Sequence, residues 1–144
     1  MTIRELQLEV VEMLNGVEAL VQGRCKAFAE DSRSTYDEAN QWAAGGKVAI
    51  VVVTPRMERS GDAAEGIPAD TRLLLRCIEK APISKNNGAI RALDAAELVM
   101  HALDGHRFCW LETDQTADRQ TGTVTATATF ATTINLQPHK PLSL

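Results

Sequence analysis

Three side chains of this sequence have the types and the spacing of a metal site: Asp94, Glu97 and His101. Spacings of three and four residues place them on adjoining parts of one helix face, where carboxylates and an imidazole could share an ion. That face lies opposite the apolar stripe of the same predicted helix, which favours a solvated surface. A histidine near a helix end is also stabilised by the helix dipole. We therefore expect no metal ion and no cofactor.

The cysteines Cys25, Cys77 and Cys109 could act as nucleophiles only if the fold brought one of them against a histidine and an orienting group. No Cys-x-x-Cys or Cys/His zinc spacing occurs in the sequence. Cys25 and Cys77 fall in predicted strands and Cys109 lies between two aromatic residues, so we expect three buried, apolar thiols in a reducing compartment. Phosphate-binding glycine motifs do not occur either, since Gly45-Gly46 precedes a strand and is better explained as a helix C-terminus. These observations favour a protein that is not an enzyme.

The composition is typical of a globular protein, with 44% hydrophobic and 24% charged residues over 144 positions. This length suits a single domain with its own core. The net charge of −4 argues against a nucleic acid partner, because phosphate-backbone binding needs a concentrated basic surface. No apolar run approaches the ~20 residues of a membrane-spanning helix. We expect a cytosolic protein without a membrane partner.

The elements that position these residues can be predicted from hydrophobic periodicity. Helical spacing predicts helices at 3–15, 36–44 and 89–104, with Thr2 and Glu5 capping the first and Ser34 or Thr35 the second. Leu93 and Met100 belong to the apolar stripe of the third. Strands are predicted within 19–31 and at 48–53, 71–82, 108–111 and 122–136, with a projecting loop at 56–70 after Pro55 and a polar connection at 114–122.

Neighbouring strands in this order are joined without helices, which predicts an α+β fold. We expect a mixed, largely antiparallel sheet with about three helices packed mainly on one face and a long C-terminal strand. Residues 1–136 are predicted to form one domain, and residues 137–144 an irregular tail.

The predicted C-terminal strand alternates strictly, with apolar residues such as Phe130 and Ile134 on one face. Threonines occupy the other face, which could lie against a neighbouring subunit without burying an unpaired charge. The charged loop at 56–70 allows two interpretations, a solvated turn or a contact surface for a partner. The candidate interface residues are therefore Arg56, Arg59, Asp62, Glu65, Thr123, Thr125, Thr127 and Thr129.

The order of motifs along the chain resembles that of small tail-assembly proteins of tailed bacteriophages and prophages. The chain contains, in this order, KVAIVVVTP, a charged loop, LLLRCIEKAPISKNNG, a helix containing LDAAELVMHAL and a long terminal strand. The stretch IEKAPISKNNGAIRALDAAELVMHAL resembles the family's Glu-x-x-Pro-x-x-Asn turn before an Ala-rich helix, with Glu79, Pro82 and Asn86 in the motif positions and Asn86 displaced by one residue. TYDEANQWAAGGKVAIVVVTP fits the family's helix–glycine–strand unit, and the resemblance covers about residues 3–136.

The resemblance implies a tail terminator, also called a tail-completion protein, which performs no catalysis. Such proteins form rings, commonly hexamers, on the last ring of tail-tube subunits, stop tube polymerisation and present a surface to the head or neck. The implied partners are further copies of the chain, the tail-tube protein and head or neck connector proteins, while DNA would only pass through the ring lumen. The implied location is the virion tail, assembled in the bacterial host cytoplasm.

Two alternatives remain open at this point. The chain could be another head–tail connector component or a tube-like subunit of the same assembly. It could also be a small enzyme or ligand-binding domain with a pocket near His101, His106 and Cys109.

Overall fold

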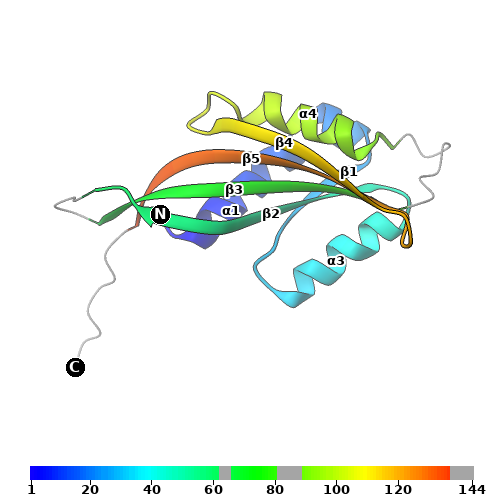
Figure 1. Cartoon of the computed structure of the whole chain (residues 1–144), viewed down its shortest axis with the longest axis horizontal. Helices are drawn as coiled ribbons and strands as arrows, with labels where there is room; N and C mark the ends of the chain where they lie inside the picture. Colours follow the sequence, from blue (N-terminus) through cyan, green and yellow to red (C-terminus); the bar gives the residue numbers. More distant parts are fainter. Residues whose placement is uncertain (62–65, 81–88, 137–144) are drawn as a thin grey trace.

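The structure, a computed structural model, describes residues 1–61, 66–80 and 89–136. Its elements are α1 (Ile3–Asn15), α2 (Glu18–Gln22), β1 (Cys25–Ala29), α3 (Arg33–Ala44), β2 (Val48–Arg59), β3 (Ile67–Lys80), α4 (Ala92–Leu103), β4 (Cys109–Asp118) and β5 (Thr123–Leu136). The strands form one sheet in the order β1-β2-β3-β5-β4, in which only the β1–β2 pair is parallel (Figure 1). The predicted α+β fold with a mixed, largely antiparallel sheet is confirmed. None of the helices in the described ranges is long and apolar enough to cross a membrane.

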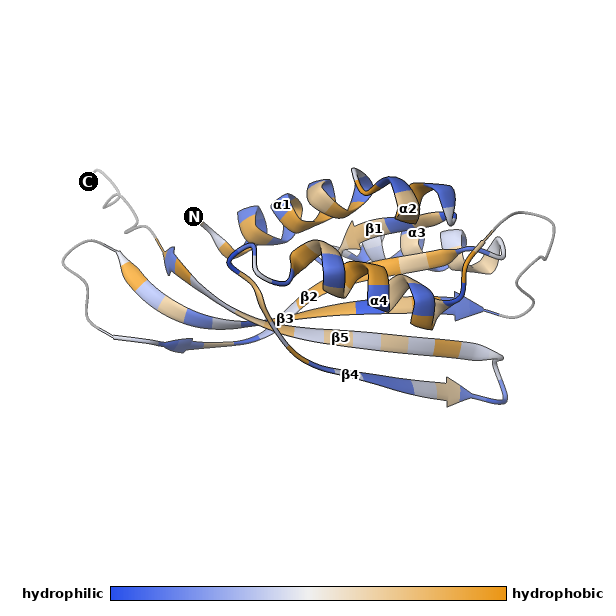
Figure 2. Cartoon of the chain, turned by 90° about the horizontal axis from the view of Figure 1, so that it is seen from above, coloured by the Kyte–Doolittle hydropathy of each residue, from blue (hydrophilic) through white to orange (hydrophobic). Residues whose placement is uncertain are grey.

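One face of the sheet, here called the inner face, is covered by α1, α2 and α4 (Figure 2). Helix α1 presents Leu6, Val10 and Leu14 to it, four residues apart, so that they fall on one side of the helix. Strands β3 and β5 contribute every second residue, and Leu73, Leu75 and Phe130 are fully buried there. The apolar half of the β5 alternation therefore forms the core, as the sequence predicts.

Helix α3 packs on the opposite face, here called the outer face, where it covers the β1–β2 side and also contacts Ile78 and Lys80 near the end of β3 (Figure 1). Its small residues Ala39 and Ala43 lie against Phe28, Ala49 and Val51 in a second, smaller core. The prediction of helices mainly on one face thus holds for three of the four described helices. In the described part of the chain, no helix covers the outer face of β5 and β4 or the remainder of that face of β3.

Two segments that the sequence predicts as loops belong to strands. Strand β2 continues past Pro55 to Arg59, and β3 begins at Ile67, so most of the predicted loop at 56–70 is a β-hairpin. Proline is tolerated because the β2–β3 register shifts between Val53 and Arg56, which gives a bulge. This part of β2 also lies beyond the end of β1, so it needs no ladder partner on that side. Strand β4 similarly runs on through 114–118, although the sequence predicts a polar connection there.

The hairpin and the end of β5 form a projecting part of the sheet, here called the tongue: residues 56–59, 67–72 and 131–136 (Figure 2). Strand β1 ends opposite Val52, and β4 begins opposite Ala131. Strands β3 and β5 have 14 residues each and extend about 46 Å. The sheet is therefore longer than the helical layer needs.

Three smaller expectations were wrong. Residues 18–22 form the short helix α2, so the strand expected within 19–31 is limited to β1. Ser32, and neither Ser34 nor Thr35, accepts the capping hydrogen bond of α3, from the Thr35 backbone N–H at 3.3 Å. Leu93 faces solvent with 51% of its surface exposed, because Ala92, Ala95 and Ala96 bring the α4 backbone close to the sheet.

Glu79 connects the end of β3 to the start of α4 and is 4% exposed. Its carboxylate accepts a hydrogen bond from the Ala92 backbone N–H at 3.0 Å and pairs with the Arg91 guanidinium at 2.9 Å. A carboxylate at this position satisfies a free N–H of the first helical turn and interacts favourably with the helix dipole. Glu79 therefore has a structural role in the motif noted in the sequence, whereas Pro82 and Asn86 lie outside the described residues, as does the tail at 137–144.

The backbone of the edge strand β1 is bonded by a side chain of α1. The Asn15 amide accepts from the Ala27 backbone N–H at 2.8 Å and donates to the Ala27 carbonyl at 3.2 Å. These two bonds imitate a neighbouring strand at that residue. The sheet thus has one edge that is partly closed, at β1, and one that carries no further described strand, at β4.

Candidate interaction surface

The uncovered part of the outer face is built from alternate residues of β3, β5 and β4. Directly opposed residues share a face in an antiparallel sheet, so Thr127 lies between Arg76 and Asp114, and Thr125 lies between Ile78 and Thr116. Thr123, Thr125, Thr127 and Thr129 are all half-buried. The threonine row is uncharged, as predicted, but charged residues of β3 and β4 flank it. Arg76 is itself 3.9 Å from Glu30.

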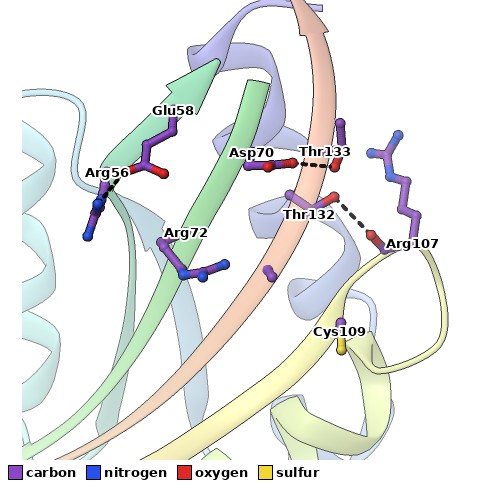
Figure 3. A pocket seen from close by; sticks show the side chains of 9 residues that line it. Arg56, Glu58, Asp70, Arg72, Arg107, Cys109, Thr132 and Thr133 are labelled. Carbon is purple, nitrogen blue, oxygen red and sulfur yellow. Dashed lines mark hydrogen bonds and ion pairs between the residues drawn. The ribbon is translucent and has the colours of Figure 1, made fainter. Parts of the chain in front are cut away.

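A shallow hollow of about 530 Å³ lies on the same face at the base of the tongue (Figure 3). We call it the arginine hollow, after Arg56, Arg72 and Arg107, which line it with Glu58, Asp70, Cys109, Ala131, Thr132 and Thr133.

Two of the three guanidinium groups have acidic partners within the chain. Arg56 forms an ion pair with Glu58, and Arg107 lies 2.5 Å from Glu9 of α1. Arg72 is exposed and forms no ion pair with a carboxylate of the described residues. An exposed guanidinium can bind a carboxylate with two parallel hydrogen bonds. The hollow is therefore suited to an acidic side chain of a partner.

Neighbouring side chains fix the walls of the arginine hollow. The Thr133 hydroxyl donates to Asp70 at 3.0 Å, across the β3–β5 pair. The Thr132 hydroxyl points to the inner face and donates to the Arg107 carbonyl at 2.8 Å, which holds the turn before β4 in place. Figure 3 shows both bonds and the separate orientation of the Arg72 side chain. The hollow is thus built on strands, with little freedom to rearrange.

The predicted interface residues do not form one patch. Arg56 and Arg59 lie in the tongue, where the Arg59 side chain donates to the Gly61 carbonyl at 3.2 Å. Thr123 lies at the opposite end of β5, beside Lys80 of β3. Asp62 and Glu65 lie outside the described residues. Thr125, Thr127 and Thr129 remain as the central row, and Arg72 and Arg107 join Arg56 although the sequence analysis missed them.

A second hollow, of about 340 Å³, lies at the β1 edge beside α3. We call it the lysine hollow, because Lys26 and Lys47 both approach the ring of Trp42, at 5.6 Å and 4.1 Å from its centre. Trp42 is fixed by its ring N–H, which donates to the Val48 carbonyl at 3.0 Å. The ammonium of Lys26 is also 5.4 Å from the ring of Phe28. Such cation–π contacts bring both ammonium groups to one indole ring.

The residues considered for a metal site or for the alternative enzymatic site are spread over different surfaces. Asp94 accepts from the Arg91 backbone N–H at 3.3 Å and so serves the start of α4. His101 is exposed, 3.9 Å from Glu97, and lines a small hollow with Met100, Asp104 and Trp110. Cys109 lines the arginine hollow instead. The prediction of three buried thiols is wrong for Cys109, which is exposed, whereas Cys25 and Cys77 are buried.

Burial raises the pKa of the Cys25 thiol to about 12. Burial raises the pKa of the Cys77 thiol too, and the neighbouring Cys25 adds a smaller contribution in the same direction. Both thiols therefore stay protonated at neutral pH, which makes them inert as nucleophiles.

A scan of protein-family models and a search of curated proteins gave no match to this sequence.

Proposed function

We propose that this chain is a structural subunit of a phage-type tail. In this proposal, copies of it form a ring on the end of the tail tube, stop tube polymerisation and join the tail to the head or neck. The observation that carries the proposal is the outer face of β5, β4 and most of β3, which is mainly polar, half-buried to exposed, and not covered by a helix among the described residues. The ring would belong to the virion tail and be assembled in the host cytoplasm.

A closed ring needs two different surfaces on each subunit, one that meets the preceding copy and one that meets the next. The threonine row offers one of these surfaces; the row itself is uncharged, and the charged residues beside it, Arg76 and Asp114, would meet partners on the other copy. The tongue and the arginine hollow offer a second, charged surface for the tube or neck protein. Strands of 14 residues supply both surfaces on a rigid support.

A double substitution on the threonine row tests this proposal. Thr125→Lys with Thr127→Lys is expected to leave the monomer folded, since both side chains are half-exposed, and to weaken ring closure by placing two charges in the contact. Native mass spectrometry and negative-stain imaging, with and without tail tubes, would measure assembly. Glu12→Lys is the matched control, because it changes the net charge by the same two units on the exposed side of α1.

Each outcome bears on a different part of the proposal. Normal rings from the double variant would remove the threonine row from the interface. A wild-type protein that stays monomeric and never caps tubes would contradict the proposed function. Long filaments in place of rings would favour a tube-like subunit. A turnover that His101→Ala with His106→Ala abolishes, while assembly is unaffected, would favour the enzymatic alternative.

A further inference from the structure

Strand β4 forms an acidic edge of the sheet. Its ten residues contain Glu112, Asp114 and Asp118 and no lysine or arginine. Glu112 and Asp114 are exposed, oppose Thr129 and Thr127 on the outer face, and form no ion pair with a basic group of the described residues. We call this pair of carboxylates the acidic edge. Leu111 is 44% exposed and directly precedes Glu112, whereas Trp110 opposes Phe130 and lies on the inner face beside Met100 of α4.

The lysine hollow lies at the other edge of the same sheet. Cys25 and Ala27 point to the inner core, so Lys26 and Phe28 project from the outer face, where α3 also packs. Neither Lys26 nor Lys47 has a carboxylate of the described residues within 4 Å, although Glu38 is among the residues that line the hollow. Two ammonium groups that line one hollow repel each other, and an anion bound in that hollow would offset the repulsion.

The two features therefore complement each other in charge and lie on the same face of the sheet. Strands β1 and β4 are the outermost of five, so about 19 Å of sheet separates them at ~4.8 Å per strand. Contact between two acidic edges, or between two lysine hollows, would place like charges together. Contact between unlike edges matches them, and such a head-to-tail contact is the kind that closes into a ring.

We propose that the acidic edge of one copy of this chain docks on the lysine hollow of the next, with Glu112 and Asp114 facing Lys26 and Lys47. This inference rests on the proposed function and adds the two sheet edges to the ring contact, in which the acidic edge adjoins the threonine row. The contact is made by side chains, because Asn15 already bonds the β1 backbone at Ala27. The exposed apolar surface of Leu111, which directly precedes Glu112, would be available at the same edge.

Complementary charge reversals test the inference. Variant A is Glu112→Lys with Asp114→Lys, and variant B is Lys26→Glu with Lys47→Glu. Each alone has two edges of the same sign, so each is expected to need a roughly tenfold or higher protein concentration to form rings. An equimolar mixture restores unlike charges at every contact if A and B alternate. Native mass spectrometry would then show rings with equal numbers of both.

Controls separate the charge effect from a loss of folding. Thermal unfolding of each variant would establish that it is folded, and Lys26→Gln with Lys47→Gln is a milder version of B that adds no negative charge. Glu12→Lys with Glu97→Lys changes two exposed helix carboxylates by the same charge as A and is expected to leave rings intact. Raised salt should weaken wild-type rings more than it weakens the fold, since the contact is ionic.

The outcomes distinguish this inference from the proposed function. Rings from the A–B mixture but not from A or B alone support it. Wild-type rings that A and B also form normally, or two folded variants whose mixture fails to assemble, would overturn it and leave the ring intact as a proposal. Rings formed by variant A with the wild type, in which the β4 edge of one contacts the β4 edge of the other, would overturn the inference as well. A wild-type protein that neither forms rings nor caps tubes would contradict the proposed function itself.

Discussion

Replacing Glu79 should destabilise the fold more than replacing any exposed carboxylate of the chain. Glu79→Ala removes the acceptor of the Ala92 N–H and the partner of Arg91 in a site that is 4% exposed. A hydrogen bond to a charged group contributes about 1.5–3 kcal/mol. The Arg91 pair adds about 0–1 kcal/mol, because the Arg91 side chain is 65% exposed. We therefore expect a loss of about 1.5–4 kcal/mol.

Conservative variants divide this loss between its causes. Glu79→Gln keeps an oxygen for the Ala92 N–H but removes the charge, so it should cost about half as much as Glu79→Ala. Arg91→Ala leaves the carboxylate bonded to Ala92 and should cost about 1 kcal/mol or less, as expected of an exposed partner. Glu97→Ala is the control, since Glu97 is 71% exposed and should be near neutral.

Urea unfolding monitored by far-UV circular dichroism would measure these differences as shifts of the midpoint at constant slope. Thermal unfolding should agree, with about 2–4 °C lost per kcal/mol for a domain of this size. If Glu79→Ala lies within about 0.5 kcal/mol of the wild type, or if Arg91→Ala is the more damaging change, then the carboxylate does not hold the start of α4. The role given to Glu79 here would then be wrong.

Two further predictions concern the thiols and the tongue. Cys109 should react with a thiol reagent in the native protein at pH 8, and Cys25 and Cys77 only after denaturation. Because their folded pKa values are raised above the ordinary 9.0, their stabilising effect is complete below pH 9. This stabilisation is lost as the pH rises from 9 toward about 12, and the folding equilibrium constant falls by up to about tenfold per thiol for each pH unit. A urea midpoint that stays constant between about pH 9 and 10.5 would contradict the burial of the two thiols. Gly66→Ala should destabilise the protein, because Gly66 has a φ of +78° and an added Cβ would lie 2.6 Å from the Leu136 carbonyl oxygen, whereas Gly61→Ala meets no atom within 4 Å and should be near neutral in the same unfolding assay.

The sequence predicts the inner half of the fold well, because burial imposes a period there. Leu73, Leu75 and Cys77 alternate with more polar residues in β3, and Leu6, Val10 and Leu14 recur at helical spacing in α1. Each pattern arises because one side of the element must be apolar to face a helix or a sheet. The long β5 strand is predicted almost to the residue for the same reason.

Strand β4 and the tongue show why the rest could not be predicted. Nine of the ten β4 residues are exposed and the tenth is half-buried, so no side of the strand must be apolar, and its backbone is held by pairing with β5, which is distant in sequence. Pro55 predicts the end of a strand, because a proline has no backbone N–H to donate to a neighbouring strand. In the structure the residue lies at a β-bulge, where no such hydrogen bond is needed, and β2 continues.

The candidate surfaces escaped prediction for a related reason. Arg72, Arg107 and Arg56 come from three distant segments, and only the register of β2, β3, β5 and β4 brings them to one hollow. Lys26 and Lys47 are likewise joined by the parallel pairing of β1 with β2 and by Trp42 of α3.

The amide of Asn15 at the β1 edge has a consequence for growth of the sheet. Copies that joined β4 to β1 through backbone hydrogen bonds would extend one twisted sheet indefinitely, because each addition would recreate the same open edge. The backbone N–H and carbonyl of Ala27 are already bonded to Asn15, so they are not available to pair with a β4 strand of another copy. Side chains are then left to set the angle between neighbours, and a fixed angle can bring the last copy back to the first.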